Sequence, residues 1–67
     1  MNNKDTKLLQ LGHKIAQFRK EKHLSQNQLA ENLDISREHL AKIETAKRCI
    51  SLGLLIRFAD RYLYILV

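Results

Sequence analysis

The sequence predicts an all-α fold, a compact single domain of four to five short helices over residues 1–67. Its 67 residues include no proline and only two glycines, a composition typical of helices because sheets need many turns. Apolar residues make up 45% of the chain and recur with helical spacing. A domain of this size buries only about 60% of the surface that its unfolded chain exposes, so every apolar stripe must contribute to one core.

The first helix is expected over residues 6–22. Residues 1–5 are polar and show no periodicity, which predicts a loose end before the helix. From there the apolar positions recur at helical spacing, with basic residues mostly on the opposite side. These apolar positions are Leu8, Leu11, Ile15 and Phe18.

Three serines mark the starts of the remaining helices. Ser25, Ser36 and Ser51 can each accept a hydrogen bond from the free backbone N–H groups of a first helical turn. Each has an apolar residue just before it and another four helical positions later, as in a hydrophobic staple, and Gln28 completes a capping box with Ser25. These caps divide the rest of the chain into helices over 26–33, 37–45 and 52–64.

Only residues 34–36 join the second and third predicted helices. A link this short between two short helices forces a sharp angle, which is the geometry of a helix-turn-helix. Leu29, Leu40 and Ile43 lie on the inner faces of the two helices, and the small Ala30 stands where the backbones approach most closely. The sequence therefore predicts a helix-turn-helix over residues 26–45.

Three motifs occur in and around this segment: LSQxxLA at residues 24–30, ISxxxLxxIE at 35–44 and KRxxSL at 47–52. With them, residues 11–59 resemble the lambda-repressor-like helix-turn-helix family of phage repressors, bacterial regulators and restriction-modification controller proteins. The family usually has glycine where Asp34 and Ala46 stand and frequently proline where Ile50 stands. Aspartate can adopt the left-handed conformation that a tight turn requires.

The resemblance makes the helix at 37–45 a recognition helix, with the side opposite Leu40 and Ile43 facing the major groove. Arg37 can donate two hydrogen bonds to guanine, Glu38 can accept one from cytosine, and Lys42 can reach guanine or a phosphate. The family also implies that Gln26 binds a phosphate and braces this helix, while residues 47–48 hold the DNA backbone. The predicted DNA-binding residues are Gln26, Ser36, Arg37, Glu38, His39, Lys42, Thr45, Lys47 and Arg48.

Glu44 lies beside Ile43 on the side approaching the core, where an unpaired carboxylate is costly. The family places an arginine of the first helix at this point, and Arg19 is the matching residue. The resemblance therefore predicts a structural Arg19–Glu44 ion pair.

The last predicted helix carries more apolar residues than one core face needs. Leu52, Leu55, Phe58, Ala59 and Tyr62 match the core face of the family. The surplus predicts a homodimer interface, against the alternative that the tail folds back over its own core. The predicted interface residues are Leu54, Leu63, Ile65 and Leu66.

Other site chemistries have little support in the sequence. The spacing of the three histidines and Cys49 fits no zinc pattern, and the serines are explained as caps, so we expect no metal, no cofactor, no small-molecule ligand and no enzymatic activity. The chain has no secretory signal and no apolar run near the roughly 20 residues of a membrane span, which predicts a cytoplasmic protein.

A net charge of +5 favours a polyanionic partner, either nucleic acid or an anionic membrane surface. Taken alone, Arg37, Glu38 and Lys42 are equally compatible with a solvated helix face holding a Glu38–Lys42 pair. Together with the resemblance, they predict a homodimeric transcriptional regulator, a repressor, that binds a near-palindromic double-stranded DNA operator. The alternative is an antitoxin-like or adaptor module that binds another protein through its apolar tail.

Overall fold

The computed structural model describes the backbone of residues 3–63 and the side chains of residues 6–63. Over this range the chain forms four α-helices and one π-helical turn, and it has no strand. In chain order the elements are α1 (Asn3–Glu21), α2 (Gln26–Leu33), α3 (Arg37–Glu44), α4 (Leu52–Phe58) and the π-helix η1 (Ala59–Leu63). The all-α fold predicted from the sequence is confirmed.

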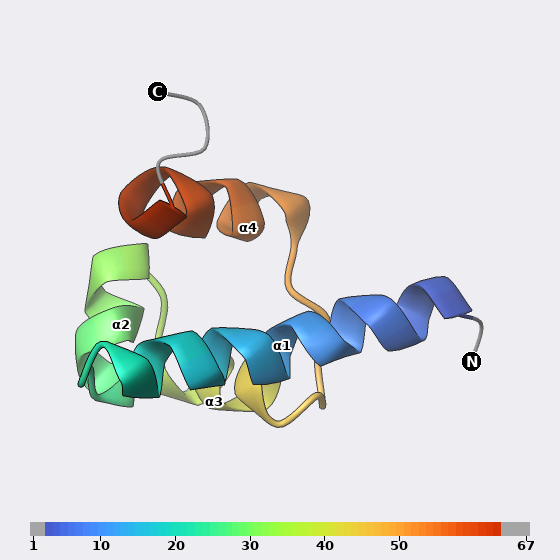
Figure 1. Cartoon of the computed structure of the whole chain (residues 1–67), viewed down its shortest axis with the longest axis horizontal. Helices are drawn as coiled ribbons and strands as arrows, with labels where there is room; N and C mark the ends of the chain where they lie inside the picture. The colour runs from blue at the N-terminus through green and yellow to red at the C-terminus, as the bar shows by residue number, and fades with distance from the viewer. Residues whose placement is uncertain (1–2, 64–67) are drawn as a thin grey trace.

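The long helix α1 runs across the view of Figure 1, between α4 above and α3 below. α3 packs against α1 and α2, and α2 also packs against α4, which lies across from α3 in the view of Figure 1. The link at residues 34–36 turns the chain sharply between α2 and α3. α3 is therefore supported from one side by two other helices.

The core lies where these helices meet. Four side chains from α2 and α3 are fully buried: Leu29, Leu33, Leu40 and Ile43. Ala30 of α2 is also buried beside them. The remaining core residues come from α1, the loop before α4 and α4: Ile15, Ile50, Leu54 and Phe58. Every helix thus uses its apolar face in a single core, as a chain of this length requires.

An aromatic cluster joins α1 to the C-terminal part of the domain. The ring of Phe18 lies 5.3 Å from Phe58 and 5.6 Å from Tyr62 in edge-to-face arrangements. The Tyr62 hydroxyl also accepts a hydrogen bond from the Asn32 amide, and Arg57 donates one to the backbone oxygen of Leu33. These contacts fix α4 and η1 against both α1 and the end of α2.

The three predicted serine caps are present. The hydroxyl oxygens of Ser25 and Ser36 accept backbone hydrogen bonds at 3.0 Å, and that of Ser51 accepts one at 3.2 Å. The side-chain oxygen of Gln28 accepts a hydrogen bond from the backbone N–H of Ser25, which completes the capping box. The starts of α2, α3 and α4 therefore follow directly from local sequence.

The ends of α1, α2 and α3 also share one geometry. His23, Asp34 and Ala46 each have a positive φ, at 59°, 61° and 62°. At each position this residue and the next donate backbone N–H groups to carbonyls three and five residues back, which is the Schellman motif. All three residues are therefore L residues in a conformation that favours glycine, including the two positions where the family usually has one.

The backbones of α1 and α3 approach closely at Gly12. A Cβ atom added to Gly12 would lie 1.8 Å from the backbone oxygen of Ile43 and 2.8 Å from its carbonyl carbon. No side chain other than hydrogen fits there without movement of one helix. Gly12 therefore sets the distance between α1 and the C-terminal end of α3.

The N-terminal boundary predicted from the sequence is wrong, because α1 begins at Asn3 and not near residue 6. Polar residues lack an apolar period, but adding residues to an existing helix needs no new nucleation. Elsewhere the bounds differ little: α1 ends at Glu21 instead of 22, and α3 ends at Glu44 instead of 45. The predicted fourth helix is α4 followed by the π-helical turn η1.

The predicted core face of α4 is wrong at Leu52, while Phe58 is buried and Leu55 and Tyr62 pack against the core as predicted. Leu54 is only 6% exposed and packs in the core, whereas Leu52 is 72% exposed. Apolar residues occupy most positions of α4, so periodicity could not select a face; Leu54 and Phe58, one turn apart, face inward together. Leu54 is thus unavailable for a dimer interface, Leu63 is exposed, and the predicted interface residues Ile65 and Leu66 lie outside the described residues.

Candidate nucleic-acid interface

The short helix α3 has one buried and one exposed side. Leu40, Ile43 and Glu44 are buried against α1 and α2. The opposite side carries the exposed residues Arg37, Glu38, Lys42 and Thr45, with His39 half-buried beside them. α3 therefore presents charged and polar groups together on a face that is exposed within the described part of the chain.

Two of the predicted contact residues already interact with each other. The Lys42 ammonium lies 3.7 Å from the Glu38 carboxylate, one helical turn away. Such an exposed pair contributes little to stability, so both groups can exchange it for other partners. Thr45 is more constrained, because its hydroxyl donates a 2.8 Å hydrogen bond to the backbone oxygen of Ala41.

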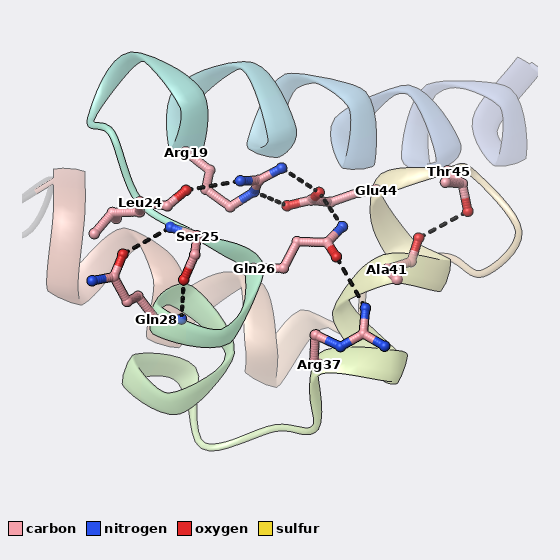
Figure 2. Close-up of polar contacts among 9 residues, drawn as sticks. All are labelled: Arg19, Leu24, Ser25, Gln26, Gln28, Arg37, Ala41, Glu44 and Thr45. Carbon is pink, nitrogen blue, oxygen red and sulfur yellow. Dashed lines mark hydrogen bonds and ion pairs between the residues drawn. The ribbon is translucent and has the colours of Figure 1, made fainter.

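Beneath this face, Arg19 and Glu44 form the ion pair that the resemblance implied (Figure 2). Arg19 Nε donates to Glu44 Oε2 at 2.7 Å, and Nη2 donates to Oε1 at 3.1 Å. Arg19 Nη1 donates to the backbone oxygen of Leu24. The buried Glu44 carboxylate, 6% exposed, is thus neutralised by a bidentate partner, as burial of a charge requires.

Gln26 extends the network from the ion pair to the exposed face. Its Nε2 donates to Glu44 Oε1 at 3.0 Å, and its Oε1 accepts from Arg37 Nη1 at 3.4 Å (Figure 2). The chain of contacts therefore runs from α1 through the end of α3 and the start of α2 to the first residue of α3. No pattern in the sequence predicts the Gln26–Glu44 bond, since the two residues are 18 positions apart.

A surface hollow lies beside α3, between α1 and the start of α2. Its lining includes three residues of α1 that the sequence did not single out: His13, Gln17 and Lys20. Gln26, Thr45 and the Arg19–Glu44 pair complete it. Donor groups with a cationic neighbour suit an anionic group such as a phosphate. The sequence does not indicate that a basic residue of α1 belongs to the site, because most surface helices carry basic residues.

The loop after α3 supplies two more predicted residues. Lys47 and Arg48 are exposed and directly follow the turn at Ala46. Ser36, at the other end of α3, uses its hydroxyl oxygen as the helix cap. The predicted set is therefore distributed over both ends and the outer face of α3, with Gln26 beside its first residue.

The described residues show neither a metal-binding cluster nor a membrane-spanning helix. No three histidine, cysteine, aspartate or glutamate side chains within residues 6–63 are grouped so that they could hold a metal ion. None of the described helices has the length and apolar character needed to cross a membrane.

The model of a family described as helix-turn-helix matches residues 15–62 of the chain. The match runs from the buried Ile15 of α1 to Tyr62 of η1, and it includes the whole of α2, the turn, α3 and α4. No curated protein matches the chain.

Proposed function

The chain belongs to this lambda-repressor-like helix-turn-helix family, whose members are DNA-binding regulators, and from that premise we propose that it is a sequence-specific transcription regulator reading DNA with α3. The observation that carries the proposal is the exposed face of α3. Arg37, Glu38 and Lys42 are exposed on it, Arg37 with a 3.4 Å contact to Gln26, and a single α-helix fits the major groove of B-DNA.

In this proposal the three charged residues read base edges. Arg37 presents a planar fork that matches O6 and N7 of guanine, Glu38 accepts from N4 of cytosine, and Lys42 reaches guanine or a phosphate. The Glu38–Lys42 pair separates on binding, at small cost because both side chains are exposed.

Residues around α3 hold the phosphate backbone in this proposal. Lys47 and Arg48 follow the C-terminal end of the helix, and the hollow with His13, Gln17 and Lys20 lies beside it. Such contacts set the register of a protein on DNA without reading sequence. A net charge of +5 supports the attraction to a polyanion.

We further propose that the protein binds its operator as a homodimer through α4 and η1. Leu52, Ile56 and Leu63 are the large apolar side chains exposed within the described residues. Leu52 and Ile56 lie one turn apart on the same side of α4, and Leu63 is exposed at the end of η1. In this proposal these residues replace the surface around Leu54. Three side chains fall well short of the roughly 800 Å² per partner of a stable interface, so dimerisation is weak until DNA aligns two copies.

Two copies so arranged would place their α3 helices in successive major grooves about 34 Å apart, on a near-palindromic operator. The proposed role is repression, in which an occupied operator blocks access of the polymerase to a promoter. A reporter gene placed behind the selected operator tests it, since expression should fall when the protein is produced; a rise in expression would show an activator.

The experiment that tests the main proposal is selection of duplexes from a random DNA pool, followed by binding measurements at two salt concentrations. We expect one near-palindromic sequence, a steep loss of affinity with salt, and a loss of about 1–3 kcal/mol at one base position in Arg37→Ala. The matched control is Arg61→Ala, which removes the same charge from η1 and should leave base preference unchanged.

If the pool yields no preferred sequence, the proposal is wrong. The exposed side chains of Leu52, Ile56 and Leu63 then favour the second candidate, a module that binds another protein. That candidate predicts a stable heterocomplex that Ile56→Asp abolishes.

A further inference from the structure

We infer that Glu44, buried beneath the exposed face of α3, is a positioning residue that sets the base preference of Arg37 through Gln26. The inference rests on the proposed function, because it assigns a role within the reading of DNA by α3. It gives Glu44 a task beyond neutralising Arg19.

The direction of the Gln26 side-chain amide depends on Glu44. An ionised carboxylate can only accept hydrogen bonds, and the two ends of an amide are one donor and one acceptor of nearly equal shape. Because Glu44 is held by Arg19 at 2.7 Å and 3.1 Å, it can face only the Nε2 end of Gln26. Glu44 therefore fixes the orientation of the amide.

The orientation of the amide determines which of its ends faces Arg37. With Nε2 turned toward Glu44, Oε1 of Gln26 faces the start of α3, where Arg37 Nη1 donates to it. Arginine cannot accept a hydrogen bond. Donor and acceptor thus alternate from Arg19 to Arg37, and no link in the series can be reversed (Figure 2).

Arg37 is itself an exposed side chain with many accessible rotamers. Its contact with Gln26 engages one of five N–H donors and leaves the remainder of the fork for a base. Arg37 is therefore partly ordered before it meets DNA, and preorganisation of this kind increases discrimination between correct and incorrect partners.

The test is Glu44→Gln, which keeps the size of the side chain but allows it to donate as well as accept. The Gln26 amide then loses its fixed direction, and its donor end can face the donors of Arg37. Affinities are measured for duplexes carrying each of the four base pairs at the position where Arg37→Ala changes the preference. We expect discrimination at that position to fall roughly fivefold, as part of the value of a bidentate contact, with other positions unchanged.

A double-mutant cycle separates this role from a structural one. If Glu44 acts through Arg37, adding Glu44→Gln to Arg37→Ala should not change the base profile further. A general loosening of the domain would instead lower affinity for all sequences by one factor. If Glu44→Gln gives only that uniform loss while Arg37→Ala changes the profile, the inference is wrong and the proposed function stands.

If Arg37→Ala leaves the profile unchanged, Arg37 does not read a base and the inference is wrong, while the proposed function is decided by whether the pool yields a preferred sequence. Thermal unfolding shows whether Glu44→Gln is folded at the assay temperature. Should it not fold, Gln26→Met serves as the second variant, because it leaves the Arg19–Glu44 pair in place. It must reduce discrimination at the same base position, whatever uniform loss follows from a missing phosphate contact; unchanged discrimination refutes the inference.

Discussion

Substituting Gly12 by alanine tests the close approach of α1 and α3. The added methyl group would lie 1.8 Å from the backbone oxygen of Ile43, so roughly 1.5 Å of separation is needed to reach ordinary contact. The oxygen belongs to the backbone, and the methyl carbon is bonded directly to Cα, so neither atom can rotate aside. Either α1 or the end of α3 has to shift.

The expected magnitude combines two opposing effects. Overpacking of a tight interface costs about 1–3 kcal/mol and occasionally more, while replacing glycine inside a helix contributes about 0.5–1 kcal/mol in the opposite sense. The contact is with backbone, and Glu44, the residue after Ile43, anchors the network to Arg19, so we take the upper part of the first range. The net loss is about 2 kcal/mol, a large share of the roughly 3–10 kcal/mol expected for 67 residues.

Thermal unfolding followed by circular dichroism measures this loss as a decrease in Tm of about 8–16 °C. Gly53→Ala is the matched control, because Gly53 also lies in a helix but a Cβ there would meet nothing within 4 Å. It should raise the stability by about 0.5–1 kcal/mol. The same substitution is thus expected to have opposite signs at the two glycines.

A Gly12→Ala protein as stable as the wild type would refute the reasoning. It would mean that α1 and α3 move apart at no cost and that their spacing is not set by backbone contact. A decrease in Tm for both variants would contradict the expected gain from alanine in a helix, and the loss at Gly12 could then not be assigned to the backbone contact.

Three further substitutions test other features. Ala46→Gly should raise Tm, since the left-handed conformation at φ 62° costs alanine about 1–2 kcal/mol and the added flexibility of the unfolded chain offsets only part of the gain; a lower Tm would contradict this. Ser36→Ala should lower the free energy of unfolding in urea by about 1 kcal/mol, and an unchanged midpoint would show that the cap contributes nothing. Leu54→Ala should cost about 2–5 kcal/mol while Leu52→Ala stays within about 0.5 kcal/mol; the reverse order would restore the core face that the sequence suggested.

The sequence predicts the local parts of this fold well. Ser25, Ser36 and Ser51 carry their own signals for helix starts, because a cap depends only on the residues of one turn. The Arg19–Glu44 pair could also be anticipated, but only through the resemblance, since 25 residues separate the partners. Features that depend only on a few neighbouring positions, such as the serine caps, could therefore be predicted from the sequence itself.

What the sequence leaves open depends on how helices meet. The inner face of α4 could not be selected because both Leu52 and Leu54 are apolar, and only packing against Phe18 and the end of α2 decides between them. Gly12 gives no sign of its close contact, as a glycine inside a helix has several explanations. The role of Gln26 as a link between Glu44 and Arg37 requires three elements to be placed at once.

The eight-residue length of α3 has a further consequence for how the protein persists in a cell. A helix this short does not hold its shape in water by itself, so its outer face exists only while the whole domain is folded. For a regulator working through α3, DNA at 100 times its Kd would add about 2.7 kcal/mol to folding stability. Molecules on an operator would be protected from proteases and free ones would be removed first, so that turnover would adjust the supply of protein to the number of sites occupied.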